Sequence, residues 1–190
     1  MLRKFKIFTA MVLMLLFMSV KTFAAMPDIS SGSKQFDPFT MCYILKDNVK
    51  VVQQDRTITA DRAVVKITEQ KVWAVGDVTL SQAGLWFKCD KIFVQGLDNK
   101  VDVIGNLDFV QDGTLKITAD VGTFSWKSKM ADFYGHVKLN VDNSFSKKKI
   151  NGLYDHVKYD IVNKKIIALD KSYQPIPKAE FSESDPVEGK

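Results

Sequence analysis

The sequence predicts an all-β fold made of about four two-stranded repeats of roughly 30 residues each. Three observations predict it. A glycine followed by Asp, Asn or His and then by Val or Leu recurs at Gly76, Gly105 and Gly135. Around each glycine, apolar residues alternate with polar ones, which is the period of a half-buried strand. The chain after the leader shows no convincing helical periodicity. Such repeats stack because no single unit can bury its own apolar face.

Each repeat carries two signatures. A weaker first copy has Asp47-Asn48-Val49 in the glycine position, so the four copies start 29, 29 and 30 residues apart. The second signature follows downstream as Ile58-Thr59-Ala60-Asp61, Phe87-Lys88-Cys89-Asp90, Ile117-Thr118-Ala119-Asp120 and Ile150-Asn151-Gly152.

Both signatures predict bends. A glycine inside an inward-facing row marks a bulge or a bend, with a tight turn as the alternative. After Asp61, Asp90 and Asp120 the apolar residues change face, which requires an extra residue or a corner. Each unit is therefore predicted to be a long strand, a hairpin turn and a strand kinked near its aspartate.

The chain divides into four segments. Residues 1–25 have the pattern of a signal peptide, with basic residues before a 14-residue apolar run, Ile7 to Val20, and small residues before Met26. A retained membrane anchor is the alternative, but a span needs about 20 apolar residues. Residues 26–38 have the composition of a linker, 39–170 form the β domain, and 171–190 form a proline-containing flexible tail.

Charge argues against a nucleic-acid partner. The leader removes four basic residues and no acidic ones, so the remainder has 23 basic against 22 acidic residues. A nucleic-acid-binding protein needs a concentrated positive face, which a net charge of about +1 does not supply.

The residues that could take part in catalysis or metal binding do not form a recognisable active site. His136 and His156 lack the neighbouring ligands of a metal site, and we expect both to be solvated. The aspartates recur once per unit, as structural corner residues do. We expect neither an enzyme nor a cofactor. Cys89 fills a position occupied by small residues in other copies, so a Cys42–Cys89 disulfide is disfavoured but left open.

The exported leader and the repeated Gly-(Asp/Asn/His)-(Val/Leu) and Ile-Thr-Ala-Asp motifs resemble the OstA-like family over about residues 45 to 170. The resemblance implies an open, V-shaped β-jellyroll whose interior is a hydrophobic groove for the acyl chains of lipopolysaccharide. It also implies a periplasmic protein that transports lipopolysaccharide from the inner to the outer membrane, with transport proteins of the same fold as partners.

The alternating rows supply the candidate lipid A-binding residues of this groove. They are Val49, Val51, Ile58, Val78, Leu80, Phe87, Leu107, Phe109, Ile117, Val137, Leu139 and Ile150. The same rows also suit a closed core without ligand. Two other functions stay open, a membrane-anchored partner of the same fold and a structural β-repeat polymer.

An open sheet leaves two unpaired edges, which are templates for another chain. We expect head-to-tail homo-oligomers that join the edge near Val49–Val52 of one molecule to the edge near Val157–Leu169 of the next.

Overall fold

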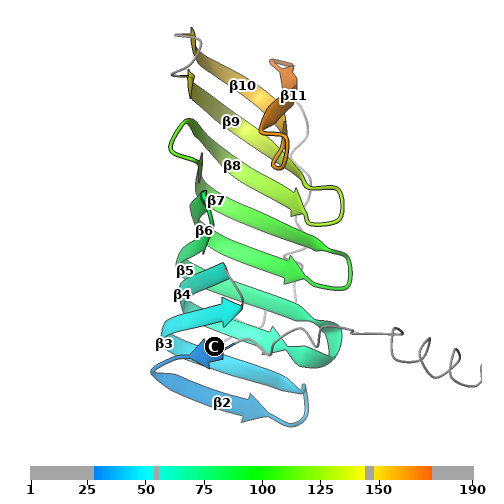
Figure 1. The fold of residues 1–190 in the computed structure, drawn as a ribbon. Coiled ribbons are helices and arrows are strands. Elements are labelled where there is room, and N and C mark those ends of the chain that lie inside the picture. Colours follow the sequence, from blue (N-terminus) through cyan, green and yellow to red (C-terminus); the bar gives the residue numbers. More distant parts are fainter. Residues whose placement is uncertain (1–27, 54–55, 144–147, 173–190) are drawn as a thin grey trace, which may run out of the picture.

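The computed structural model describes residues 28–53, 56–143 and 148–172, which form one antiparallel β-sheet (Figure 1). The predicted signal peptide lies outside the described residues. The strands are β1 (Asp28–Ser30), β2 (Ser33–Asp37), β3 (Cys42–Gln53), β4 (Arg56–Lys66), β5 (Lys71–Gln82), β6 (Leu85–Gln95), β7 (Lys100–Gln111), β8 (Leu115–Ser125), β9 (Met130–Asn143), β10 (Lys148–Asp160) and β11 (Lys165–Asp170), with one short 3-10 helix, Ile67–Glu69.

The sheet is an open meander. Its order is β1-β3-β4-β5-β6-β7-β8-β9-β10-β11, and β2 pairs with β3 beside β1. The first and last strands are not paired with each other, so the sheet does not close. The four predicted repeats are the hairpins β3–β4, β5–β6, β7–β8 and β9–β10. Within the described part of the chain, no helix has the length and apolarity that a membrane crossing requires.

The predicted bends are confirmed. In the β7–β8 hairpin, Gly105 and Asn106 lie between the pairs Ile104↔Val121 and Leu107↔Ala119, so these two residues oppose Asp120 alone. Two residues opposite one form a β-bulge, which bends the strand. Similar bulges interrupt the other three hairpins.

The glycine and the aspartate occupy the same corner. Gly105 has φ +76, in the left-handed region that favours glycine. A Cβ on Gly105 would also overlap the Asp90 carboxylate of the preceding strand, and Gly76 and Gly135 stand in the same relation to Asp61 and Asp120. The two sequence signatures are therefore two sides of one corner, which explains why they recur together.

The corners line up into a crease at residues 31–32, 47–48, 61, 76–77, 90, 105–106, 120, 135–136 and 155. The crease divides the sheet into two arms. Arm A comprises residues 33–46, 62–75, 91–104, 121–134 and 156–170, and arm B comprises 28–30, 49–53, 56–60, 78–89, 107–119, 137–143 and 148–154. Each long strand thus crosses from one arm to the other.

The last repeat differs from its prediction. Its corner is Asp155, opposite Gly135 and His136, and Gly152 pairs with Leu139. Ile150-Asn151-Gly152 is therefore not the equivalent of Ile117-Thr118-Ala119, because β9 and β10 are longer than the other strands of the hairpins and the corner comes later.

The predicted linker and the predicted N-terminal edge are also wrong. Within 26–38, β1 pairs with Lys50–Val52 and β2 pairs with Cys42–Lys46. Gly32 sits at the crease, where a Cβ would press on Asp47. A serine-rich stretch has linker composition, but backbone hydrogen bonds to an edge do not depend on composition. The edge at Val49–Val52 is consequently covered by β1.

Candidate functional site

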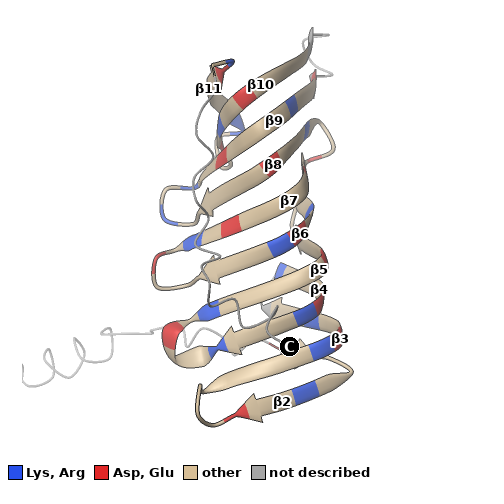
Figure 2. Ribbon diagram, turned by 180° about the vertical axis from the view of Figure 1, so that it is seen from behind, with Lys and Arg blue, Asp and Glu red and all other residues tan. Residues whose placement is uncertain are grey.

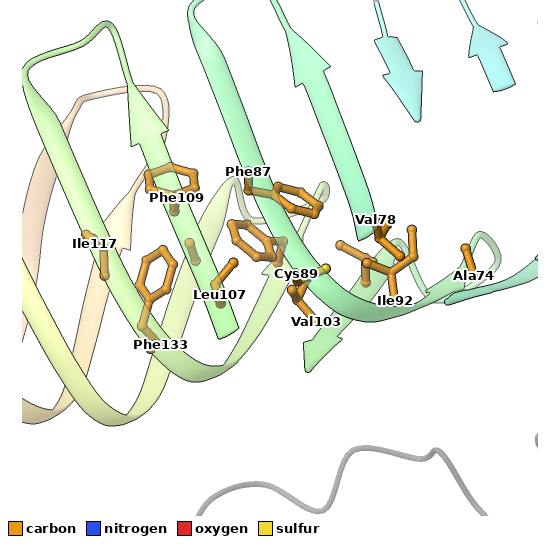
Figure 3. Packing of buried hydrophobic residues seen from close by; sticks show 14 of the residues in the cluster. Ala74, Val78, Phe87, Cys89, Ile92, Val103, Leu107, Phe109, Ile117 and Phe133 are labelled. Carbon is orange, nitrogen blue, oxygen red and sulfur yellow. The ribbon is translucent and has the colours of Figure 1, made fainter. Parts of the chain in front are cut away.

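The inner faces of the two arms share one continuous apolar cluster (Figure 3). Most of the predicted groove residues are buried in it, namely Val49, Val78, Phe87, Leu107, Phe109, Ile117, Val137 and Leu139. Val51, Ile58 and Leu80 are half-buried and pack against the same cluster. Ile150 pairs with Val141 through its strand, and its side chain is outside the described part. The structure thus places on one face the eleven predicted residues whose side chains it describes.

Aromatic side chains join the arms across this interior. Phe109 of arm B lies 5.8 Å from Phe124 and 5.3 Å from Phe133 of arm A, between ring centroids. Phe87 stacks on Phe124 at 5.5 Å. Gly122 of arm A leaves room for Leu107 of arm B, since a Cβ there would lie 2.6 Å from a Leu107 methyl group. In this conformation the middle of the interior is therefore a packed core.

The tips of the two arms enclose an opening, which we call the mouth. Polar contacts bridge it near the C-terminal end of the sheet. The Gln111 side-chain amide of arm B donates a hydrogen bond to the Ile161 carbonyl at the β10–β11 turn, 3.0 Å away. Beside it, Lys164 forms an ion pair of 2.6 Å with Asp112. The oxygen of the Gln111 amide is buried without a partner. These contacts hold the tips of the two arms together.

Apolar surface remains accessible at the ends of the sheet. Ile29 on β1 and Ile166 on β11 pack only partly against the interior. Leu169 on β11 is 43% exposed. Tyr154 folds back over Gly152, and the ammonium of Lys171 lies 5.6 Å from the Tyr154 ring centroid. The inner face therefore opens at its two edge strands and not in its middle.

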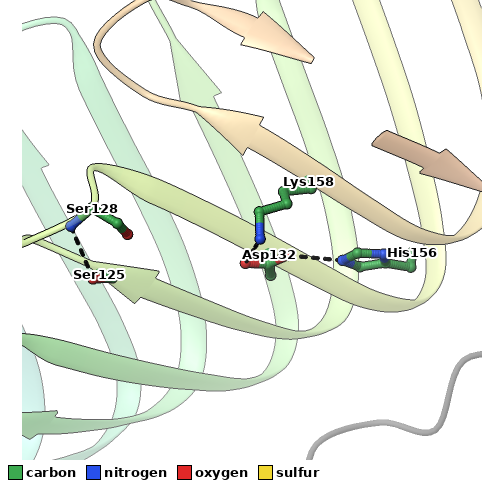
Figure 4. Close-up of polar contacts among 5 residues, drawn as sticks. All are labelled: Ser125, Ser128, Asp132, His156 and Lys158. Atoms are coloured by element: carbon green, nitrogen blue, oxygen red, sulfur yellow. Dashed lines mark hydrogen bonds and ion pairs between the residues drawn. The ribbon is translucent and has the colours of Figure 1, made fainter. Parts of the chain in front are cut away.

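Both histidines contact aspartates on neighbouring strands of the sheet. At the crease, Nδ1 of His136 lies 2.6 Å from the Asp120 carboxylate, which raises the pKa of this exposed histidine. His156 is not solvated as predicted, because its ring stacks on Tyr134 at 4.5 Å and bonds Asp132 at 2.9 Å. Figure 4 shows the His156–Asp132 contact and, beside it, the ion pair in which the Lys158 ammonium lies 3.7 Å from the Asp132 carboxylate.

The described residues also bear on metal binding and on the cysteines. No group of three His, Cys, Asp or Glu residues among them has the arrangement of a metal site. Cys42 and Cys89 are unpaired and buried, so the disulfide that the sequence left open is not formed. Burial raises the pKa of the Cys89 thiol to about 12, which keeps it protonated and unreactive. Basic and acidic residues are spread over the strands without one dominant sign (Figure 2).

Sequence reasoning missed a second apolar surface, on the outside of arm A. Val64 and Phe93 point away from the interior, yet they are only 2% and 3% exposed. The sequence does contain a signal of this surface, because it has two uninterrupted apolar runs, Val72-Trp73-Ala74-Val75 and Ile92-Phe93-Val94. Such runs are typical of strands that are buried on both faces.

No curated protein matches this chain significantly. A similar solved structure is LptH from Pseudomonas aeruginosa, described as the LptA homologous periplasmic component of the lipopolysaccharide transport device. It is 13% identical, with a TM-score of 0.49, over 67% of this chain and 92% of that one. The family described as LptA/(LptD N-terminal domain) LPS transport protein matches residues 28–174. Since that match spans most of the chain and confirms the resemblance, the protein belongs to this LptA-like family of lipopolysaccharide transport proteins.

Proposed function

We propose that the protein carries lipopolysaccharide by holding the lipid A acyl chains between its two arms. One observation carries the proposal: an apolar inner face runs across the sheet from Ile29 to Ile166, and the sheet does not close. In a member of a lipopolysaccharide transport family, such a face is the natural place for acyl chains.

Binding requires the arms to part. The inner residues are packed together, so acyl chains must replace contacts such as those of Phe109 with Phe124 and Phe133. The exchange is energetically feasible because each buried methylene contributes about 0.8 kcal/mol and lipid A carries many. We infer that loading begins at the accessible edge strands and proceeds inward as the arms separate.

We further propose that the protein is exported to the periplasm and that its leader is removed. The pattern of basic residues, apolar run and small residues in 1–25 supports export. N-terminal sequencing of the protein from periplasmic extract tests this. A start at Ala25 or Met26 is expected, and an intact leader would identify the membrane-anchored form instead.

The open edges support head-to-tail assembly and docking to transport proteins of the same fold. Within the described sheet, β1 and β2 form one edge and β11 forms the other, and the outward backbone groups of an edge strand can pair with another chain. Joining β11 of one molecule to β1 and β2 of the next is a heterologous contact, which gives oligomers of variable length. Ile167→Pro should shorten them in light scattering, whereas Leu97→Pro, at the second position of the exposed Gly96–Asn99 turn, should not. A chain that stays monomeric at high concentration would argue for a diffusing carrier.

Photo-crosslinking tests the lipid site without inserting a charge into the core. We would place a benzophenone amino acid at Ile58 or Leu80, which face the interior, and at Thr59 or Thr79, which lie one residue away on the outer face of the same strands. Lipopolysaccharide should become attached after irradiation at the inner positions only, because side chains alternate along a strand.

Labelling at the matched outer positions shows whether attachment at the inner positions is specific. Equal labelling at Thr79 and Leu80 would mean non-specific adsorption to the sheet. Folded protein that is labelled at neither inner position would refute the groove and favour a structural β-repeat protein without ligand.

A further inference from the structure

An apolar stripe runs across the outer face of arm A. Ile44 pairs with Val64, Val64 with Trp73 and Trp73 with Phe93, so these four side chains lie side by side on successive strands. Trp73 and Phe93 are stacked, with their ring centroids 5.0 Å apart. Cys42 and Val75 complete this surface, which we call the outer stripe.

Val64 and Phe93 in the outer stripe are much less accessible than their counterpart on arm B, while Ile44 and Trp73 are half-buried. Phe93 is 3% exposed, whereas Trp86, on the outer face of the same strand β6 in arm B, is 36% exposed. Every strand pairing among the described residues lies within the one sheet, and the outer stripe is not part of the interior cluster. The side chains of a bare outer face remain partly open to water, so the near-complete burial of Val64 and Phe93 requires a cover.

We propose that the C-terminal segment, residues 173–190, packs across the outer stripe. The described chain ends just after β11, at the edge of the sheet, and 18 residues follow. At about 3.1 Å per residue, an extended proline-containing segment reaches roughly 55 Å. About six strand spacings of about 4.8 Å separate β11 from β5, a path of roughly 29 Å, so the segment is long enough.

The chemistry of the segment fits the surface. Tyr173, Ile176 and Phe181 supply apolar groups for the outer stripe. Pro175 and Pro177 lack the amide donors of a β-ladder, which favours a chain lying on side chains over one extending the sheet edge.

Charge complements the apolar fit. The segment contains four acidic and two basic residues. Basic side chains border the outer stripe towards the crease, namely Lys46, Arg62 and Lys91. Towards the turns, Lys66 and Lys71 share one acidic partner, Glu69, which leaves a net positive charge there too. An acidic segment is therefore a better occupant than a neutral one.

Tryptophan fluorescence tests the proposal, because the chain has three tryptophans and one lies in the outer stripe. Trp86→Phe with Trp126→Phe leaves Trp73 as the only reporter, and the matched control, Trp73→Phe with Trp126→Phe, leaves Trp86 on arm B. Truncation after Ser172 removes no described strand. It should raise acrylamide quenching of Trp73 about two-fold or more, because an uncovered indole meets solvent, and leave quenching of Trp86 unchanged.

A second measurement needs no tryptophan substitution. An amine cross-linker applied to the full chain at low concentration should join Lys178 to Lys71 or Lys91, and Ile176→Asp with Phe181→Asp should abolish that link while Ser184→Asp preserves it. Quenching of Trp73 that is unchanged by truncation overturns the proposal. Quenching that depends on protein concentration but not on the segment also overturns it, and would assign the outer stripe to contact between copies.

Discussion

The outer faces of the two arms are built by the same strands but differ in character. On arm B, Thr59 and Thr79 face each other with their hydroxyl groups 2.6 Å apart, and Lys116 pairs with Asp108 at 2.8 Å. On arm A, the corresponding row in β4 to β6 is Val64, Trp73 and Phe93. Since each long strand crosses the crease, a single strand such as β6 has a solvated half and a half that is apolar on both faces.

This difference shows that repeats with similar sequences can lie in different environments. Farther along arm A the same outer row becomes polar at Asp102, which is 2% exposed. Its carboxylate accepts hydrogen bonds from Thr123 at 3.0 Å and Gln95 at 3.3 Å and pairs with Lys100 at 3.0 Å. The corners repeat in every hairpin, whereas the outer surface is specific to each position.

The largest expected effect tests the two outer faces directly. Phe93→Ala should lower the free energy of unfolding by about 3–5 kcal/mol, because a buried aromatic ring is removed. Lys88→Ala, on the outer face of the same strand in arm B, should change it by less than about 0.5 kcal/mol. Urea denaturation followed by circular dichroism measures both. Similar losses would show that the two faces are energetically alike.

The next effect concerns the crease that separates the arms. Gly105→Ala should cost about 1–3 kcal/mol, from its positive φ and from overlap with Asp90. Gly113→Ala is the matched control, since Gly113 has φ +69 and nothing lies within 4 Å of the position that its Cβ would take.

The same denaturation assay separates the two causes. Combining Gly105→Ala with Asp90→Ala should bring the loss down towards that of Gly113→Ala, because the closest overlapping atoms, those of the carboxylate, are removed and only the Cβ of residue 90 remains, 3.0 Å away. If Gly113→Ala alone costs as much as Gly105→Ala, the carboxylate has no part in the corner.

A smaller effect is expected where the tips of the arms meet. Lys164→Ala removes an exposed ion pair with Asp112 and should reduce stability by less than about 1 kcal/mol. Under the proposed function it should also speed the uptake of a fluorescent lipid A analogue, because the mouth is less firmly closed. Lys129→Ala, in another turn of arm A, provides the control. Unchanged uptake would mean that the mouth does not limit loading.

The smallest expected effect is the pH dependence of the stability that the corner at His136 and Asp120 contributes. The Asp120 carboxylate raises the pKa of His136 above its ordinary value of 6.5, so the fold favours the protonated form. The stabilisation is present below pH 6.5 and is lost as pH rises through the higher folded-state pKa. An NMR titration of the imidazole protons should show the raised pKa and its return towards 6.5 in Asp120→Asn. An unchanged pKa in that variant would assign the shift to another group.

Much of the fold follows from local pattern. Alternation assigned Val78, Leu107 and Val137 to one face, and the structure buries all three on the inner face. The glycines and aspartates marked the corners, since positive φ and a face change leave traces within a few residues. That these residues bind lipid stays a prediction.

Other features had weak or misleading signals. The pairing of β1 and β2 was missed because edge strands use backbone hydrogen bonds that many side chains permit. The corner at Asp155 was misplaced because β9 and β10 are longer than the strands of the other hairpins, so the corner does not keep the spacing of the repeat.

By itself, the sequence determined the all-β class, the hairpin repeat, the crease and the inward rows, because each depends on neighbours a few residues apart. Only the tertiary structure decided how the arms meet. The packing of Phe87 on Phe124 and the hydrogen bond from Gln111 to Ile161 join residues 37 and 50 positions apart. Such contacts depend on the angle between two arms, which is set by all the corners together and is encoded in no single repeat.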